Sequence, residues 1–186
     1  MLDDNELVSR VLSGDLRAFN LLVEQYQRLV FHVVGKMIDN QQDVEDVCQE
    51  VFIKIYRGLH LFGFRSKLST WIASIAYLSS VNHLKKAKKY PLAVEQPDLE
   101  KFSLADVNLL EEVTQRDLAA NIHKIVNQLP ALYKVLVNLY HLHGFSYLEM
   151  VKITGIPEGT IKSYLFRARK MLKDQIIANT KNKEHE

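Results

Sequence analysis

The chain has 186 residues, of which 47% are hydrophobic, and a formal net charge of +2 at pH 7. Its 7 glycines and 4 prolines are too few for the frequent tight turns of a β-sandwich, so we expect an all-α protein. The small net charge excludes a uniformly basic wrapper of nucleic acid, and the single cysteine excludes an internal disulfide and a cysteine-based zinc site.

Charge of the two signs is segregated along the chain. Acidic residues gather near the N-terminus, between positions 39 and 50 and from Asp98 to Asp117, whereas basic residues gather between Lys85 and Lys89 and after Lys162. Such separation suits a protein that meets nucleic acid on one side and a basic protein surface on another. Since no stretch resembles a signal peptide or approaches the ~18 apolar residues of a membrane span, we expect a soluble, cytoplasmic protein.

The first half of the chain predicts three helices. Apolar residues recur at three and four between Ala18 and Ile38, which is typical of an amphipathic helix. A second helix turns Val44, Val47 and Val51 inward and leaves an outward acidic face. The segment from 57 to 67 lacks helical periodicity and is rich in aromatic residues, which indicates a structured loop. Ser69 is expected to cap the third helix, which runs into the lysine cluster.

A linker is expected from position 90, because the segment contains Pro91 and Pro97 and has no clear period. We therefore predict two small helical domains, at 1–89 and 113–178, joined by a flexible linker at 90–112. A helix ending at Pro130 and another ending near Gly144 open the second domain. The polar residues 179–186 are expected to form a frayed tail.

The C-terminal part predicts a helix-turn-helix. Ser146 and Glu149 form a capping box, Gly155 ends the short helix that follows, and a second helix starts at Glu158. With Ile161 and Leu165 inward, the outer face is cationic and suits a DNA major groove. A solvated basic helix on an αα-hairpin is the alternative, but the capped start, the glycine turn and the apolar positions favour DNA binding.

Together these segments resemble the sigma-70 family, in particular its extracytoplasmic function (ECF) group, which keeps only the second and fourth conserved regions. The N-terminal likeness rests on Asp15, Ala18, Phe19, Leu22, Tyr26, the run Asp43 to Phe52, Tyr56-Arg57, Ser69 to Ile72 and Ile75-Ala76. The C-terminal likeness rests on Leu129-Pro130, Gly144 to Tyr147, Gly155 to Ser163 and Phe166 to Arg169. Any one fragment is weak, but two motif sets in this order and at this separation are specific.

The resemblance implies that the acidic helix docks on a coiled-coil of the largest subunit of core RNA polymerase. The implied contact residues are Asp46, Gln49 and Glu50, with Phe52 behind them, and Asp43 and Lys54 complete the face. A charged face on a helix is usually only solvated, and for Asp43 and Lys54 taken singly we prefer that interpretation.

The resemblance also assigns the loop and the third helix to the proximal promoter element and its melted strand. The implied residues are Phe62, Phe64, Arg65, Ser66 and Lys67 in the loop, and Leu78, Asn82, Lys85 and Lys86 on the helix. Aromatic rings can replace base stacking while cations hold the backbone. Phe62 and Phe64 could equally be core residues, and Trp71 is better explained as core. Leu78 and Asn82 depart from the usual asparagine and aspartate, which puts base-specific contacts there in doubt.

The second helix of the helix-turn-helix is implied to read the distal promoter element. The candidate residues are Thr160, Lys162, Ser163, Tyr164, Phe166, Arg167, Arg169 and Lys170. Tyr164 stands where the group commonly has arginine. The family further implies an anti-sigma partner, commonly anchored in the membrane, and no cofactor, metal or small-molecule substrate.

Two other classes of function compete. A stand-alone helix-turn-helix regulator would explain residues 146–170 but leaves the acidic helix and the aromatic loop unexplained. A metal-dependent hydrolase would need ligands converging from several elements, whereas these carboxylates lie on the outer face of one helix. His123, His141 and His143 lack the spacing of a metal motif, so we predict that the chain is not an enzyme.

Overall fold

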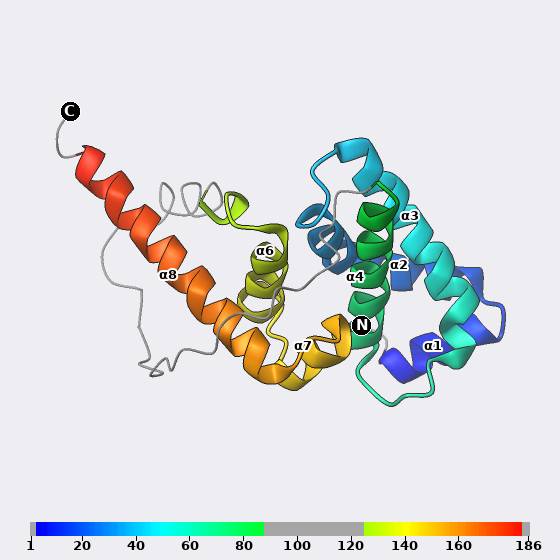
Figure 1. The fold of residues 1–186 in the computed structure, drawn as a ribbon. Coiled ribbons are helices and arrows are strands. Elements are labelled where there is room, and N and C mark those ends of the chain that lie inside the picture. Colours follow the sequence, from blue (N-terminus) through cyan, green and yellow to red (C-terminus); the bar gives the residue numbers. More distant parts are fainter. Residues whose placement is uncertain (1–2, 88–124, 184–186) are drawn as a thin grey trace.

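The computed structural model describes residues 3–87 and 125–183, and every regular element in these ranges is a helix (Figure 1). The N-terminal lobe contains α1 (Asp4–Leu12), α2 (Leu16–Gly35), α3 (Gln41–Gly58), the 3₁₀ turn η1 (Leu59–Leu61) and α4 (Leu68–Lys86). The C-terminal lobe contains α6 (Ala131–Val137), the π-helical turn η2 (Asn138–Leu142), α7 (Tyr147–Thr154) and α8 (Glu158–Lys183). The all-α prediction is confirmed. The expected linker at 90–112 and the first residues of the expected second domain lie outside the described ranges.

Polar side chains fix the turns of the N-terminal lobe. Asp15 caps α2 by accepting hydrogen bonds from the amides of Arg17 and Ala18, and its carboxylate lies 2.7 Å from the Arg10 guanidinium. The hydrogen bond from Arg10, followed by those from the amides, lowers the pKa of Asp15. Asn40 caps α3 in the same way through the amide of Asp43.

Helix α4 packs against three other helices. It packs against α2 and α3 on one side and against α7 of the C-terminal lobe on another. Its buried residues accordingly include neighbours in the sequence as well as residues three and four apart: Leu68, Thr70, Ile72, Ala73, Ala76, Tyr77, Ser79, Ser80, Val81 and Leu84. A helix that is apolar around most of its circumference belongs in a core rather than on a surface.

The predicted cap at Ser69 is wrong. Helix α4 begins one residue earlier, at Leu68, with Lys67 at the N-cap position in an extended conformation (ψ 148°) and no side chain accepting from the first turn. Leu68 is fully buried, and its burial draws it into the first helical turn at the expense of a serine cap.

The helix-turn-helix follows the predicted pattern. Ser146 Oγ accepts a hydrogen bond from the amide of Glu149, and the Glu149 carboxylate accepts one from the amide of Ser146 at 2.8 Å. Gly155 ends α7 in the left-handed region with φ 74°. Helix α8 then continues to Lys183, which lies beyond position 179, where the frayed tail is expected to begin.

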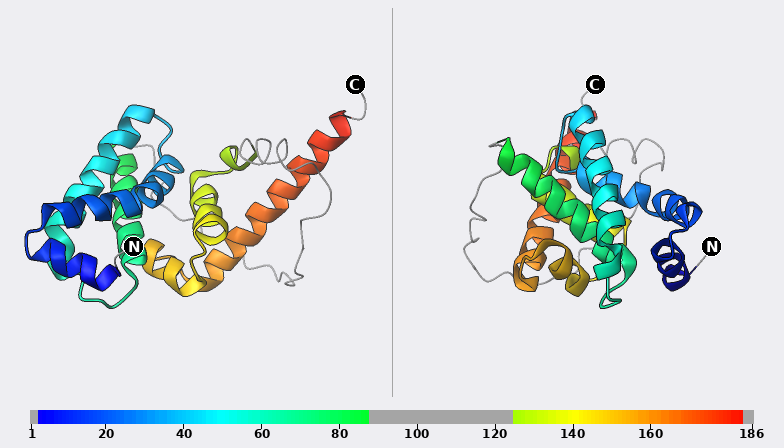
Figure 2. Two further views of the ribbon diagram at one scale, coloured as in Figure 1. Left: turned by 180° about the vertical axis from the view of Figure 1, so that it is seen from behind. Right: turned by 90° about the vertical axis from the view of Figure 1, so that its right-hand side faces the viewer.

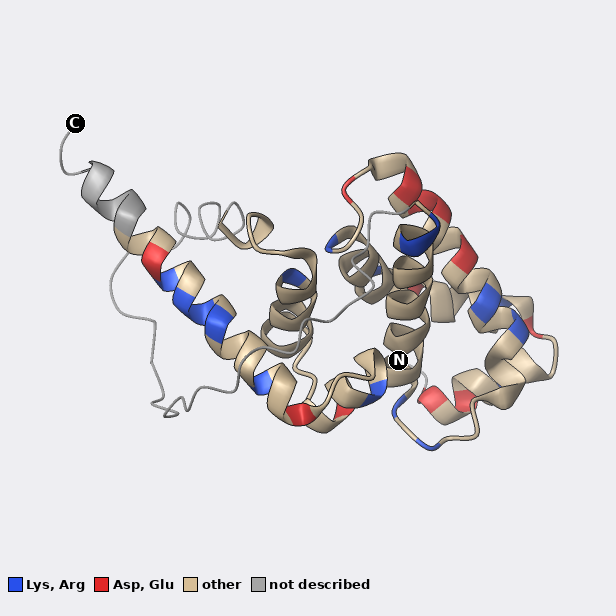
Figure 3. Cartoon of the chain, viewed as in Figure 1, with Lys and Arg blue, Asp and Glu red and all other residues tan. Residues whose placement is uncertain are grey.

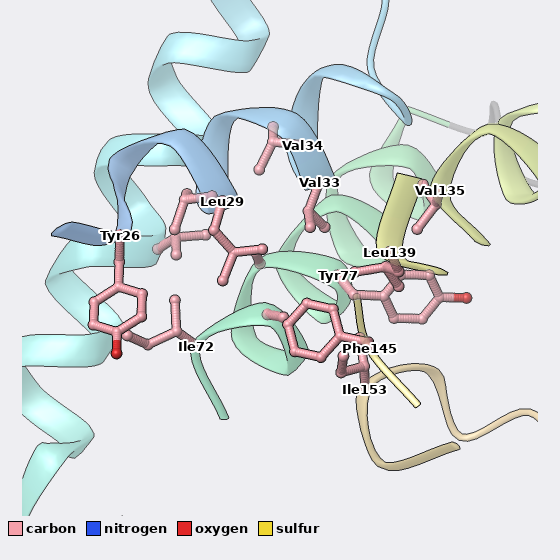
Figure 4. Packing of buried hydrophobic residues seen from close by; sticks show 14 of the residues in the cluster. Tyr26, Leu29, Val33, Val34, Ile72, Tyr77, Val135, Leu139, Phe145 and Ile153 are labelled. Atoms are coloured by element: carbon pink, nitrogen blue, oxygen red, sulfur yellow. The ribbon is translucent and has the colours of Figure 1, made fainter. Parts of the chain in front are cut away.

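The two lobes touch each other directly. Figure 2 shows α7 beside α4 from two further sides, and one contiguous set of buried apolar residues runs through both lobes. In Figure 4, Leu139, Phe145 and Ile153 of the C-terminal lobe lie against Val33 and Tyr77 of the N-terminal lobe. The sequence predicts two domains joined by a flexible linker but does not predict that they touch.

Gly155 provides a test of the turn. Replacing it with alanine puts a side chain into a left-handed conformation, which costs about 1 to 2 kcal/mol although nothing lies within 4 Å of the new Cβ. Urea unfolding of the full chain should show this loss. Gly159→Ala is the matched control, because that glycine also has open space but lies within α8, where alanine is the better helix former. Equal destabilisation by the two changes would contradict this account of the turn.

Candidate functional site

The acidic face of α3 forms a surface that we call the acidic ridge, made of Asp43, Asp46, Gln49, Glu50 and Lys54 (Figure 3). Val44, Val47, Val51 and Ile55 are buried on the opposite side of the helix. Asp46, Gln49 and Glu50 are exposed, whereas Asp43 and Lys54 are half-buried. Phe52, which the sequence places behind the ridge, packs partly against the hydrophobic core.

Two members of the ridge are tied to α4. Lys54 donates a hydrogen bond to Ser79 Oγ at 2.9 Å and forms an ion pair with Glu50 at 2.7 Å. The hydrogen bond from Lys54 is the main reason that the pKa of Glu50 lies below its usual value, so this carboxylate is charged at neutral pH. Asp43 lies 3.5 Å from His83 of α4. These contacts join the ridge to α4.

The aromatic loop divides its two phenylalanines between interior and surface. Phe62 is 5% exposed, and its ring centroid lies 5.4 Å from that of Trp71. Phe64 is 54% exposed and adopts φ 55°, directly after Gly63 at φ 58°. Of the two interpretations left open for Phe62, the structure therefore supports the core role, because a buried ring cannot stack on a base. Phe64 is accessible, and its uncommon backbone conformation is of the kind found at functional sites.

The remaining candidates of the loop and α4 lie on the surface. Arg65, Lys67, Leu78, Asn82, Lys85 and Lys86 are exposed, and Ser66 is half-buried. Leu78, Asn82 and Lys85 are spaced four and three residues apart and so share one face of α4. The ammonium of Lys67 is 3.0 Å from the Glu149 carboxylate of α7, so this loop residue also contacts the C-terminal lobe.

The cationic helix of the helix-turn-helix differs from the prediction at Tyr164. This residue is 6% exposed and packs edge to face against Tyr133 at a centroid distance of 5.3 Å. Its ring is therefore part of the C-terminal core and is unavailable to DNA in this conformation. The other candidates are at least partly accessible: Lys170 is exposed, and Thr160, Lys162, Ser163, Phe166, Arg167 and Arg169 are half-buried.

Two tyrosines outside the predicted DNA-binding residues contact cations of this helix. The ammonium of Lys162 lies 5.2 Å from the ring centroid of Tyr147 and pairs with Glu158 at 2.7 Å. The Arg169 guanidinium lies 5.5 Å from the ring centroid of Tyr140, and the two tyrosine rings stack on each other. Cation–π contacts of this kind orient long side chains. No sequence periodicity connects these pairs, because the rings come from the elements that precede α8.

In the described part of the chain, no three His, Cys, Asp or Glu side chains come together as metal ligands would. No helix in the same ranges is long and apolar enough to cross a membrane.

Comparison with known proteins identifies both lobes. Residues 22–90 match the family model of sigma-70 region 2, and residues 119–172 match that of sigma-70 region 4. The chain is 35% identical to the RNA polymerase sigma-H factor of Pseudomonas aeruginosa over 176 residues, covering 91% of each chain. It is also 35% identical to the ECF RNA polymerase sigma-E factor of Haemophilus influenzae over 182 residues, covering 94% of this chain and 96% of the relative.

Solved structures agree on the fold. CnrH in complex with the cytosolic domain of CnrY covers 94% of this chain with a TM-score of 0.64 and 19% identity. The sigma factor RpoE in complex with the anti-sigma factor NepR from Bartonella quintana covers 85% with a TM-score of 0.63 and 21% identity. Sigma factors are non-enzymatic subunits of RNA polymerase, which agrees with the prediction that the chain is not an enzyme. The chain belongs to the sigma-70 family and is an ECF sigma factor, a subunit that directs RNA polymerase in transcription initiation.

Proposed function

We propose that this sigma factor divides its work between one protein-binding and two DNA-binding surfaces. The acidic ridge docks on the coiled-coil of the largest subunit of core polymerase. The loop around Phe64 and the exposed face of α4 hold the melted proximal promoter element, and α8 reads the distal element in duplex DNA. We assign these roles to domains at 1–89 and 113–178. The observation that carries the proposal is the coexistence of an exposed carboxylate ridge with separate cationic surfaces in one chain (Figure 3).

Docking through the ridge is supported by its charge and exposure. Asp46, Gln49 and Glu50 share the exposed side of α3 over little more than one turn, so they can meet one complementary basic surface. Asp43 and Lys54 already contact residues of α4, so we assign them a supporting role. We assign polymerase binding to Asp46, Gln49 and Glu50.

Strand capture is supported by the exposure of Phe64 beside Arg65 and Lys67. A ring on the surface can stack on an unpaired base, and neighbouring cations can hold the phosphates of the same strand. Lys85 and Lys86 add two exposed cations at the opposite, C-terminal end of α4. The buried Phe62 supports the loop from beneath, because its ring packs against that of Phe64 with the two centroids 5.0 Å apart.

Distal recognition is supported by the position of α8 after the capped turn. Arg167 and Lys170 supply cations on its accessible side, and Lys162 and Arg169 are oriented by the tyrosines beneath them. Arginine and lysine contact both guanine edges and phosphates in a major groove. Each domain alone would bind DNA weakly, and their linkage raises the effective concentration of the second contact.

We further propose that an anti-sigma protein, anchored in the membrane, sequesters this factor in the cytoplasm. Two proteins that share the fold support this: CnrH was solved in complex with the cytosolic domain of CnrY, and RpoE in complex with the anti-sigma factor NepR.

Run-off transcription with purified core polymerase on genomic fragments tests the proposed role in initiation. Defined start sites are expected only when the factor is added, and their absence would contradict it.

Charge reversal of the ridge tests docking. The double change Asp46→Lys and Glu50→Lys should weaken binding of core polymerase about a hundredfold or more, because like charges placed opposite each other cost several kcal/mol. Binding can be measured by fluorescence anisotropy with the full chain. Glu24→Lys is the matched control, since it reverses an exposed carboxylate of α2 outside the ridge. If the double variant binds as the control does, the ridge is not the docking surface.

The role of Phe64 can be separated from polymerase binding. Phe64→Ala should destabilise the open promoter complex by about 1 to 3 kcal/mol, the value of one base stacked on a ring. Fluorescence of 2-aminopurine in the melted segment reports this loss at saturating holoenzyme. Leu61→Ala provides the control, because Leu61 is 74% exposed in the preceding turn but has no ring to stack. Normal melting by the Phe64 variant would show that this ring does not hold a base.

Arg167 tests distal recognition. Arg167→Ala should lower promoter-directed initiation and reduce the salt dependence of promoter binding by about one unit of slope if the residue contacts a phosphate. Affinity for core polymerase should stay unchanged. Lys173→Ala, which removes an exposed cation farther along α8, serves as the comparison. An equal loss of core affinity and of initiation would mean that Arg167 is structural.

A further inference from the structure

The contact between the lobes combines apolar packing with polar links at its edge. Besides the packing of α7 on α4, Lys67 pairs with Glu149, and Lys36 of α2 donates a hydrogen bond to Asn127 Oδ1 at 2.9 Å. Lys134 of α6 lies 3.7 Å from Asp39. Because these links join the N-terminal lobe to the C-terminal lobe, they exist only while the lobes are closed on each other.

One further link joins two histidines. Nδ1 of His32, on α2, lies 3.2 Å from Nε2 of His143, which follows η2, and the ring centroids are 5.3 Å apart. A hydrogen bond between two imidazoles needs one nitrogen to donate and the other to accept. When both rings are protonated, every ring nitrogen is a donor and the bond is lost. Two positive charges would then face each other across the interface.

We propose that His32 and His143 form a proton-sensitive latch, which holds region 4 closed on region 2 and releases it when both rings are protonated. The latch goes beyond the proposed function, since closure is a property of the chain alone. Its consequence for transcription rests on that function.

The surroundings of His143 favour its neutral form in the closed state. Burial first, and then the nearby charges of His32 and Arg28, lower the pKa of His143. Arg28 lies one turn before His32 on α2 and adds a permanent positive charge. The C-terminal lobe brings Phe145, at a ring distance of 6.3 Å from His143, and Phe145 lies beside Tyr77 of α4 and Ile153 of α7 (Figure 4). Neither Phe145 nor Ile153 carries an ionisable side chain.

The sign of the pH dependence follows from the lowered pKa. The open state binds more protons than the closed state, so closure is most stable above the ordinary histidine pKa of about 6.5 and weakens as the pH falls below it. The ratio of open to closed molecules rises by up to about tenfold per pH unit for each additional proton that the open state binds. The Glu149 link does not titrate in this range. Burial raises the pKa of Glu149, but hydrogen bonds from Ser146 and Lys67 outweigh that effect and lower it.

Closure of the lobes occupies part of the surface proposed to bind the proximal promoter element. In the closed state Lys67, a loop residue beside Phe64, is held by the Glu149 carboxylate at 3.0 Å, where a strand phosphate would compete for it. Helix α7 at the same time covers one side of α4, the helix assigned to the proximal element. Opening would free both and would let the two DNA-binding domains separate.

The test measures opening directly in the full chain. Donor and acceptor dyes are attached at Gln42→Cys and Lys152→Cys, two exposed positions in different lobes, after Cys48→Ser removes the native thiol. Energy transfer should be high at pH 8 and fall between pH 6.5 and 5.5, while circular dichroism shows unchanged helix content. Because neither polymerase nor DNA is present, failure here is distinguishable from failure of the proposed function.

Two variants separate the latch from other titrations. His143→Gln should abolish the fall in energy transfer, because an amide can accept from or donate to His32 at any pH in the range. His141→Gln should retain it, since His141 is exposed and contacts Tyr140 within its own lobe. The proposal is overturned if energy transfer is low already at pH 8, if it does not change with pH, or if His143→Gln titrates as the parent does. Loss of helix content together with energy transfer would also overturn it, because acid would then unfold the protein.

Discussion

The burial of α4 is the constraint on which the arrangement of this sigma factor depends. This helix lies between α2 and α3 on one side and α7 on another, so each functional surface is positioned relative to it. Lys54 and Asp43 of the acidic ridge contact its residues Ser79 and His83, and the aromatic loop leads directly into its first turn. Burial of apolar surface stabilises the fold by roughly 25 cal/mol per Å². An exposed ion pair contributes only about 0 to 1 kcal/mol, so the packing of α4 outweighs the polar contacts at its edges.

Polar contacts instead decide which charged groups remain available to partners. Glu50 with Lys54 and Lys162 with Glu158 are paired within one helix, whereas Lys67 with Glu149 and Lys134 with Asp39 are paired between lobes. Pairs within a helix persist in any arrangement of the domains. Pairs between lobes are lost when the lobes separate, so the charge that the molecule offers to DNA depends on its conformation.

Local patterns determined much of the fold and the family. Helices α2 and α3 follow from apolar residues at spacings of three and four, and the helix-turn-helix follows from the Ser146 and Glu149 capping box and Gly155. These signals work because hydrogen bonds and caps within a helix join residues close in the sequence. The cap rule failed at Ser69, where the buried Leu68 begins the helix instead. Burial also decided between the two interpretations left open for Phe62, and it turned inward the ring of Tyr164, for which the resemblance implied DNA contact.

By itself, then, the sequence determined the helical class, the two motif sets and the segregation of charge, all of which are properties of neighbouring residues. Only the tertiary structure decided that the lobes meet, that Phe64 rather than Phe62 is accessible, and that Tyr140 and Tyr147 hold the cations of α8. His32 and His143 are 111 residues apart, and no periodicity or capping rule extends across such a separation. Contacts of that range arise from packing of the whole chain, which a local pattern cannot encode.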